Sequence, residues 1–382
     1  MAKKRTRASN GMGSIRQRSD GLWEARYSAP DDKQHSVYAK TEKAVTAKLR
    51  AALHDLDAGA WREPSKMTVG EWLEIWLTDY QGHISERTLH KYRCIVNKHF
   101  KPLLGDVRMT KLLPMHIRRL VSQLQAQGRA ASTIHLYIGI LSTALQNAVE
   151  TGIITDNPAA KVKLQRVPPK TFHVIDRGDI PAFVDAARKT AFDNELLLML
   201  YTGMRVGEIR GLKWSDVDLD AGTIHVSRQL QQKSGTMQQL TPPKYGEDRV
   251  LHLPGEAVEV LRAQKRKQAQ QRLAAGADWH EDDLSRDLVF RQRSGKPHSD
   301  KSIFRAVRAA GSMIGIPELH PHDLRHSYAV AALRSGADVK TVQHNLGHKT
   351  ASMTLDVYAA YTDDAGQRSA EMLSEYLKNA GK

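Results

Sequence analysis

Alternating hydrophobic and polar positions mark short strands near the start of the chain. Segments 22–27 and 34–38 alternate in this way, a turn at 30–33 separates them, and segment 13–18 precedes them. Thr41 can cap a helix from 42 to about 56. Its buried side is expected to carry Ala44, Ala47, Leu49 and Leu53. We therefore expect a three-stranded sheet with one helix, forming a domain over residues 1–62 that begins with a basic tail, 1–12.

From residue 67 to residue 165, hydrophobic residues recur with the periodicity of helices. Four helices with short loops are expected: 69–77 capped by Thr68, from Ser85 or Thr88 to about 96, 116–127, and from Ser132 or Thr133 to about 149. Short loops between helices predict a compact bundle. Trp72, Trp76 and Tyr92 are interpreted as core residues of this bundle.

A connector with consecutive prolines, 166–173, leads into a third segment, 174–382, where helices alternate with strands. Strands are expected at 223–226 and 249–253, with a hairpin strand near 233–240, followed by a long basic helix at 256–271. The predicted fold class is a multidomain protein, mainly α with small β. It comprises the N-terminal sheet and helix, the helical bundle, and a mixed α/β domain.

The composition argues against a membrane-spanning, secreted or disulfide-bonded protein. The 382 residues are 41% hydrophobic, with a mean hydropathy of −0.50. No apolar run approaches the roughly 18–20 residues that a membrane span needs, and no apolar segment follows the basic N-terminus as in a secretory signal. The single cysteine, Cys94, excludes an internal disulfide and any multi-cysteine zinc site. We expect a cytoplasmic protein without membrane association and without a bound metal.

The net charge of +15 is unevenly distributed along the chain. Residues 1–66 contribute +6, residues 67–170 contribute +7, and the last 212 residues only +2. Two basic segments indicate polyanion binding, with nucleic acid as the first candidate and ordinary solubilising charge as the alternative. The candidate DNA contacts are Arg16, Arg18 and Arg26 on a polar sheet face, and Arg87, Lys91 and Lys98 in the bundle. That sheet face could lie in a major groove or be a plain solvated surface.

Four local patterns in the third segment carry candidate chemistry. Arg205 and Glu208 lie one turn apart at the start of a helix, and His322 and Arg325 share a helix face in the same way. Lys244 is expected in a hairpin turn between strands, and His348 follows a glycine turn ten residues before Tyr358. Each pattern is common alone; their order is what is informative.

Arg205, Lys244, His322, Arg325, His348 and Tyr358, in this order and spacing, resemble the active-site series of the tyrosine recombinases, the lambda-type integrases. The resemblance extends to segment 67–165 as a core-binding domain and, less specifically, to the N-terminal domain as an arm-type DNA-binding domain. It implies that Tyr358 attacks a DNA phosphodiester and forms a 3′-phosphotyrosine. No ATP and no cofactor are then needed, because the covalent bond conserves the energy of the phosphodiester.

The resemblance also implies a role for each residue. Arg205 and Arg325 would bind the non-bridging oxygens, since a guanidinium is a planar fork of donors that stays charged. Lys244 would protonate the leaving 5′-oxygen, while His348 would hydrogen-bond a non-bridging oxygen. His322 would assist as donor or acceptor, and which histidine acts as base stays open. Tyr361 is the alternative nucleophile, but the spacing from His348 favours Tyr358.

The resulting expectation is an integrase of a phage or other mobile element, active as a homotetramer on double-stranded DNA with core and arm sites. An excisionase and a host DNA-bending protein are expected partners. A C-terminal stripe of Met372, Leu373, Tyr376 and Leu377 would dock into a neighbouring protomer, or else pack on its own domain. The alternatives are a type IB topoisomerase, which uses the same tyrosine chemistry on one duplex, and a non-catalytic DNA-binding protein.

Overall fold

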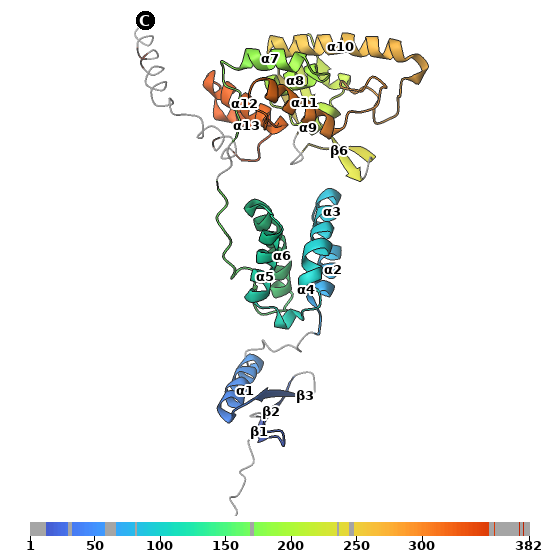
Figure 1. Cartoon of the computed structure of the whole chain (residues 1–382). Helices are drawn as coiled ribbons and strands as arrows, with labels where there is room; N and C mark the ends of the chain where they lie inside the picture. Colours follow the sequence, from blue (N-terminus) through green and yellow to red (C-terminus); the bar gives the residue numbers. More distant parts are fainter. Residues whose placement is uncertain are drawn as a thin grey trace, which may run out of the picture. The chain divides into compact units, whose positions relative to one another are not determined.

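The computed structural model describes residues 13–29, 33–57, 66–80, 82–168, 172–234, 237–243 and 248–350, together with Leu355, Ser374 and Leu377. It divides into two units between Pro168 and Pro169, inside the segment interpreted above as a connector. Each unit is described by itself (Figure 1).

The first unit begins with a three-stranded antiparallel sheet in the order β1-β2-β3, made of β1 (Ser14–Gln17), β2 (Trp23–Ser28) and β3 (Gln34–Ala39). Helix α1 (Glu42–Asp57) packs against β2 and β3, and Thr41 Oγ1 caps it by accepting from the Ala44 amide (Figure 1). The predicted helix is confirmed, but its predicted buried side is partly wrong. Ala44 and Ala47 are exposed, because the face that meets the sheet starts at Val45 and repeats at Leu49, Ala52, Leu53 and Leu56.

The helical part of the first unit matches four predicted helices with shifted ends. Its elements are α2 (Val69–Tyr80), α3 (Glu86–Ile95), a π-helical turn η1 (Val96–Phe100), α4 (Lys101–Leu104), the short η2 (Met109–Lys111), α5 (Pro114–Ala126) and α6 (Ala131–Glu150). The second predicted helix therefore continues to Leu104, and the last begins at Ala131, one or two residues before its predicted cap. Trp72 and Trp76 are buried core residues, as predicted, and each indole N–H is satisfied, by Ala144 O and Asn147 Oδ1 respectively.

The second unit is organised around one buried helix, α8 (Asp193–Thr202). The helices that pack against it are α7 (Ile180–Arg188), α9 (Val206–Gly211), α10 (Gly255–Ala275), α11 (Asp300–Met313) and α12 (Pro321–Arg334). Helix α13 (Val339–Leu346) packs on α12 (Figure 1). Nearly every side chain of α8 is buried, so its ends are positioned rigidly by its neighbours.

Two small antiparallel sheets complete the second unit. One has the order β4-β5-β8, with β4 (Val217–Asp218) after a short turn η3 (Trp214–Asp216), β5 (Thr223–Val226) and β8 (Arg249–His252). The other is a hairpin of β6 (Gln229–Ser234) and β7 (Met237–Thr241). The predicted single strand near 233–240 is wrong, since that range contains parts of both hairpin strands. A short turn η4 (Gly276–Asp278) follows α10.

The expected mainly helical architecture with small antiparallel sheets is thus confirmed, including the three-stranded N-terminal sheet. Within the described part of the chain, none of the helices has the length and apolar character needed to cross a membrane.

Candidate active site

Two glycine-terminated helix ends meet in the second unit. Gly203 ends α8 and Gly347 ends α13, both with the left-handed backbone that favours glycine, at φ 64° and φ 60°. A Cβ at Gly203 would lie 2.6 Å from Tyr328 Cδ1 and 2.7 Å from Leu346 Cδ2, so only glycine fits where α8 approaches α12 and α13. Carbonyl groups at helix C-termini have no partner in their own helix and are available as acceptors.

Arg205 and Arg325 donate to these carbonyl groups. Arg325 NH1 donates to Gly203 O at 2.8 Å and its NH2 donates to Leu346 O. Arg205 NH2 donates to Gly347 O at 2.9 Å. The two arginines, 120 positions apart in the sequence, are therefore held by the same pair of helix ends. The structure brings together the two candidates that the sequence assigned to one phosphate.

Glu208 lies between two guanidinium groups. Its carboxylate accepts from Arg205 NH1 at 2.8 Å and from the Arg205 amide at 2.9 Å, so the predicted contact within the first turn of α9 is confirmed. Arg249 donates to both oxygens of the same carboxylate, at 3.1 and 2.8 Å. Burial alone would raise the pKa of Glu208, but the hydrogen bonds and charge of Arg249, followed by those of Arg205, outweigh it and lower that pKa.

Positive charge exceeds negative charge in this cluster. Arg205 and Arg249 pair with one carboxylate, that of Glu208, and Arg325 lies near enough to feel its charge; within the described part of the chain this leaves three positive charges against one negative charge. Burial, and then the charge of Arg205, lower the pKa of Arg325. Among the described residues, Arg325 Nε is also a buried donor without an acceptor. Such surplus charge and unused donor capacity are typical of a site that binds an anion.

The two candidate histidines are close to these arginines. His322 is exposed in the first turn of α12, three residues before Arg325, and its ring lies 4.8 Å from that of His326. His348 follows Gly347 and is partly buried. Burial, then the charges of Arg325 and Arg205, lower the pKa of His348 to about 3. His348 is therefore neutral near pH 7 and offers one N–H donor and one acceptor.

Two of the six catalytic candidates, Lys244 and Tyr358, lie outside the described residues, as do Tyr361, Met372, Leu373 and Tyr376. The strands that precede and follow Lys244 in the sequence, β7 and β8, belong to different sheets, so the prediction of a hairpin between paired strands at this point is wrong.

Two of the three predicted DNA contacts of the N-terminal sheet, Arg16 and Arg26, are arranged around a buried carboxylate, whereas the third, Arg18, pairs with Asp20. Glu24 faces Arg16 on β1 and accepts from Arg16, Arg26, Ser36 and Tyr38. Burial by itself would raise the pKa of Glu24, but these hydrogen bonds and the charge of Arg16 lower it to about 2. Glu24 thus orders the arginine side chains on this face.

The bundle candidates lie on a solvent-facing helix surface. Arg87 and Lys91 are one turn apart on α3, Lys98 follows in the π-helical turn, and all three are exposed. Their role as DNA contacts remains a prediction, because exposure alone does not separate it from a solvated helix face.

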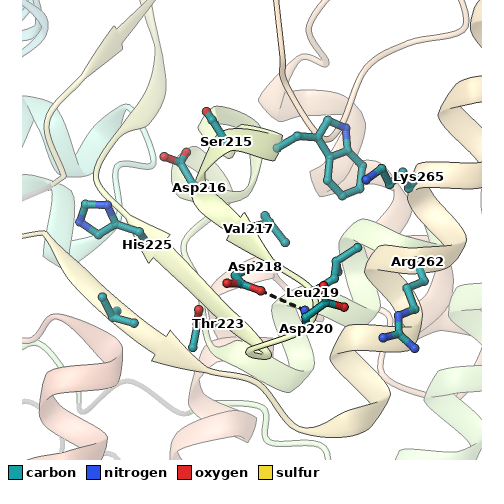
Figure 2. Close-up of a pocket in the computed structure, with 12 residues that line it drawn as sticks. Ser215, Asp216, Val217, Asp218, Leu219, Asp220, Thr223, His225, Arg262 and Lys265 are labelled. Atoms are coloured by element: carbon teal, nitrogen blue, oxygen red, sulfur yellow. Dashed lines mark hydrogen bonds between the residues drawn. The ribbon is translucent and has the colours of Figure 1, made fainter.

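A surface pocket of about 690 Å³ lies elsewhere in the second unit, between β4, β5 and α10 (Figure 2). Two of its three carboxylates have structural roles: Asp218 accepts from the Asp220 and Ala221 amides, and Asp216 pairs with Arg228. None of the four catalytic candidates that the structure describes lines it. Across the described residues, no group of three or more His, Cys, Asp or Glu is placed to hold a metal ion.

Arg249 is the member of the cluster that sequence reasoning missed. A signal was available in β8, where Arg249 shares the buried side of the strand with Leu251. A charged residue on the apolar side of an alternating strand requires a partner. The sequence gives no indication that this partner is Glu208, 41 positions earlier.

Comparisons with known proteins identify the family of the chain. Residues 174–364 match the description "Phage integrase family", and residues 68–125 match "Phage integrase, N-terminal SAM-like domain". The chain is 25% identical over 394 residues to an integrase of Streptomyces ambofaciens, covering 99% of both chains. It is also 25% identical over 358 residues to a "Tyrosine recombinase XerC-like" protein of Caldanaerobacter subterraneus subsp. tengcongensis, covering 88% of this chain and 90% of that one.

Solved structures show the same fold. The Tn1549 transposon integrase in complex with a circular intermediate DNA superposes with a TM-score of 0.69 at 19% identity, over 80% of this chain and 99% of that one. A lambda integrase tetramer bound to a Holliday junction gives a TM-score of 0.56 at 19% identity, over 92% and 96% of the two chains. At these identities the likeness concerns the fold.

Proposed function

The chain belongs to the phage integrase family and is a tyrosine-type site-specific recombinase; from this premise we propose that it cuts DNA through a covalent 3′-phosphotyrosine at Tyr358 and rejoins it by way of a Holliday junction. The observation that carries the proposal is the surplus of positive charge at Arg205, Arg249 and Arg325 around Glu208. A DNA phosphate supplies the negative charge that this cluster lacks.

The two arginines act on the transition state. A phosphorane concentrates negative charge on its non-bridging oxygens, and donors that are already oriented stabilise this charge without reorganisation. Arg205 and Arg325 are oriented by the carbonyl groups of Gly347, Gly203 and Leu346, which occupy only some of their N–H groups. Neutral His348 adds a further N–H donor.

Proton transfers accompany both halves of the cleavage step. The Tyr358 oxygen forms a bond to phosphorus, its proton passes to a base, and the bond from phosphorus to the 5′-oxygen breaks as Lys244 protonates that oxygen. A phenol with a pKa of about 10 is ionised in about one molecule in a thousand at pH 7, so the base must offset about 4 kcal/mol. Exposed His322, beside Arg325, is a candidate for this base.

The protein acts as a homotetramer on paired sites, and its N-terminal domain binds separate arm sites. The lambda integrase tetramer on a Holliday junction, which has the same fold, supports this assembly. The Glu24-ordered arginines Arg16 and Arg26 support DNA binding by the N-terminal sheet. Excision and its control by an excisionase and a host DNA-bending protein belong to this proposal.

The test is covalent trapping on a nicked duplex that carries the recombination site. Loss of the short fragment beyond the nick prevents rejoining, so wild-type protein should accumulate as a DNA adduct. Tyr358→Phe removes the nucleophile and should form none, whereas Tyr361→Phe, the matched control, should still form it. An adduct with Tyr358→Phe would contradict the assignment of the nucleophile, and relaxation of supercoiled DNA by a monomer without paired sites would instead support a topoisomerase.

A further inference from the structure

Arg249 is buried in the second unit with its charge fully engaged by protein groups. Its side chain is 3% exposed, at the first residue of β8. NH1 and NH2 donate to the two oxygens of Glu208, and Nε donates to Asn345 O at 2.7 Å. Because Arg249 directs these three nitrogens at protein acceptors and is shielded from solvent, it is not placed to bind substrate.

Arg249 contacts residues that position two catalytic candidates, Arg205 and His348. The Glu208 carboxylate accepts hydrogen bonds from both the guanidinium and the backbone amide of Arg205. Asn345 belongs to the last turn of α13, three residues before His348, and Arg249 NH1 lies 3.1 Å from where a Cβ on Gly347 would be. The guanidinium therefore packs against the glycine turn that presents His348.

We infer that Arg249 is a positioning residue for the cleavage reaction: it shares the Glu208 carboxylate so that Arg205 stays available to phosphate, and it fixes the end of α13 ahead of His348. This inference rests on the proposed function, because it assigns Arg249 to the same site.

The physical reason is competition for one carboxylate. Each Glu208 oxygen now accepts from both Arg205 and Arg249. Without Arg249, both oxygens are left to Arg205, and a bidentate pair between them would draw that guanidinium away from the phosphate. The fork geometry is essential, since a lysine supplies the charge but cannot donate to both oxygens and to Asn345 O at once.

Arg249 also lies close in the chain to Lys244. It follows Lys244 by five positions, a reach of at most about 18 Å along the chain. Strand β8 begins at Arg249, so the hydrogen bonds of that side chain fix the start of the strand that follows Lys244 in the sequence. The groups that support Arg205 and His348 thus converge on one buried side chain.

The experiment measures single-turnover cleavage of the nicked duplex and, separately, the Kd for the same duplex. Arg249→Lys keeps the charge and should slow cleavage about 100-fold, as expected for misplacement of a catalytic group by about an ångström. The Kd should change by less than about threefold, because the contacts to DNA and the net charge are retained.

The matched control is Arg291→Lys. Arg291 is another buried arginine of the second unit, held by Leu288 O and by the ring of Trp279, and it touches none of the catalytic candidates that the structure describes. Arg291→Lys should cleave at the wild-type rate. Equal rates for Arg249→Lys and wild type would overturn the inference while leaving the proposed function intact. Failure of wild type itself to form the adduct would overturn the proposed function, and the inference with it.

A pH profile and a double variant separate positioning from folding. Arg249→Gln removes the main group that lowers the pKa of Glu208, so its cleavage rate should fall with rising pH as Glu208 ionises and pairs with Arg205, whereas wild type should show no such fall. If Arg249 acts through Glu208, then adding Glu208→Gln to Arg249→Gln should abolish this fall and cost little further rate. A profile parallel to wild type, or fully additive losses, would contradict the inference.

Discussion

Replacement of Arg325 by methionine isolates the value of its guanidinium, because methionine has similar length and no charge. The variant leaves Gly203 O and Leu346 O without a donor, at a cost of about 1–3 kcal/mol each. It also removes a buried charge that lies near two other arginines and has no carboxylate of its own. Removal of such a charge recovers several kcal/mol. These terms nearly cancel, so we expect the free energy of unfolding to change by no more than about 2 kcal/mol.

The effect on cleavage should be far larger. Arg325 is the most deeply buried of the three arginines, 1% exposed, with an unpaired Nε–H among the described residues. Loss of one oriented donor in a comparable site costs about 3–4 kcal/mol, or a 10²–10³-fold decrease in rate. Arg325→Met should therefore remain folded and cleave the nicked duplex at least 100-fold more slowly.

A second assay does not depend on the DNA sequence. Sulfate carries the charge that the site lacks, and with a Kd of about 10 mM, 100 mM sulfate would stabilise the protein by about 1.4 kcal/mol. The resulting rise in Tm, about 3–6 °C, should appear in wild type and be absent from Arg325→Met at matched ionic strength. A folded Arg325→Met that cleaves within tenfold of wild type would refute the role assigned to this arginine.

Three further outcomes follow from the same structure. Deletion of residues 1–66 should preserve cleavage of a core site while integration between full sites falls sharply; equal loss of both would count against a separate arm-binding domain. Because burial and the neighbouring arginines lower the pKa of His348 to about 3, His348→Asn should slow cleavage by one factor at every pH from about 5 to 8, and a wild-type inflection that vanishes in the variant would be inconsistent with a neutral His348. Burial raises the pKa of Glu195 from 4.5 to about 7, so its ionisation destabilises the fold increasingly from pH 4.5 upward and by about 3 kcal/mol above pH 7. Glu195→Gln, which retains a hydrogen bond to His298, should raise Tm more at pH 8 than at pH 5, and equal shifts would show that Glu195 is not strained by its charge.

Local signals predicted most helices and the series of catalytic candidates. Thr68 forms the expected cap of α2 with Glu71, and the pair of Arg205 and Glu208 lies in the first turn of α9 as the spacing required. Both features depend on residues three or four positions apart, which interact whenever a helix forms. Such contacts can be read directly from a sequence.

Contacts between distant segments could not be predicted in this way. The sequence placed Ala44 and Ala47 on the buried face of α1, but that face is set by which side meets the sheet, and it starts at Val45. In the same way, no local pattern indicates that the carbonyl groups of Gly203 and Gly347 accept hydrogen bonds from Arg325 and Arg205. Nor does any local pattern indicate that Arg249 and Arg205 bind the same carboxylate, that of Glu208. These are tertiary contacts across 41 to 142 positions.

The most direct test of the central claim is to locate the covalent bond. Wild-type protein trapped on the nicked duplex can be digested with nuclease and protease, and the peptide that carries the residual nucleotide can be sequenced by mass spectrometry. We predict a nucleotide attached through a 3′-phosphate to the hydroxyl oxygen of Tyr358. Attachment at any other residue, or complete cleavage without a protein–DNA adduct, would contradict the account.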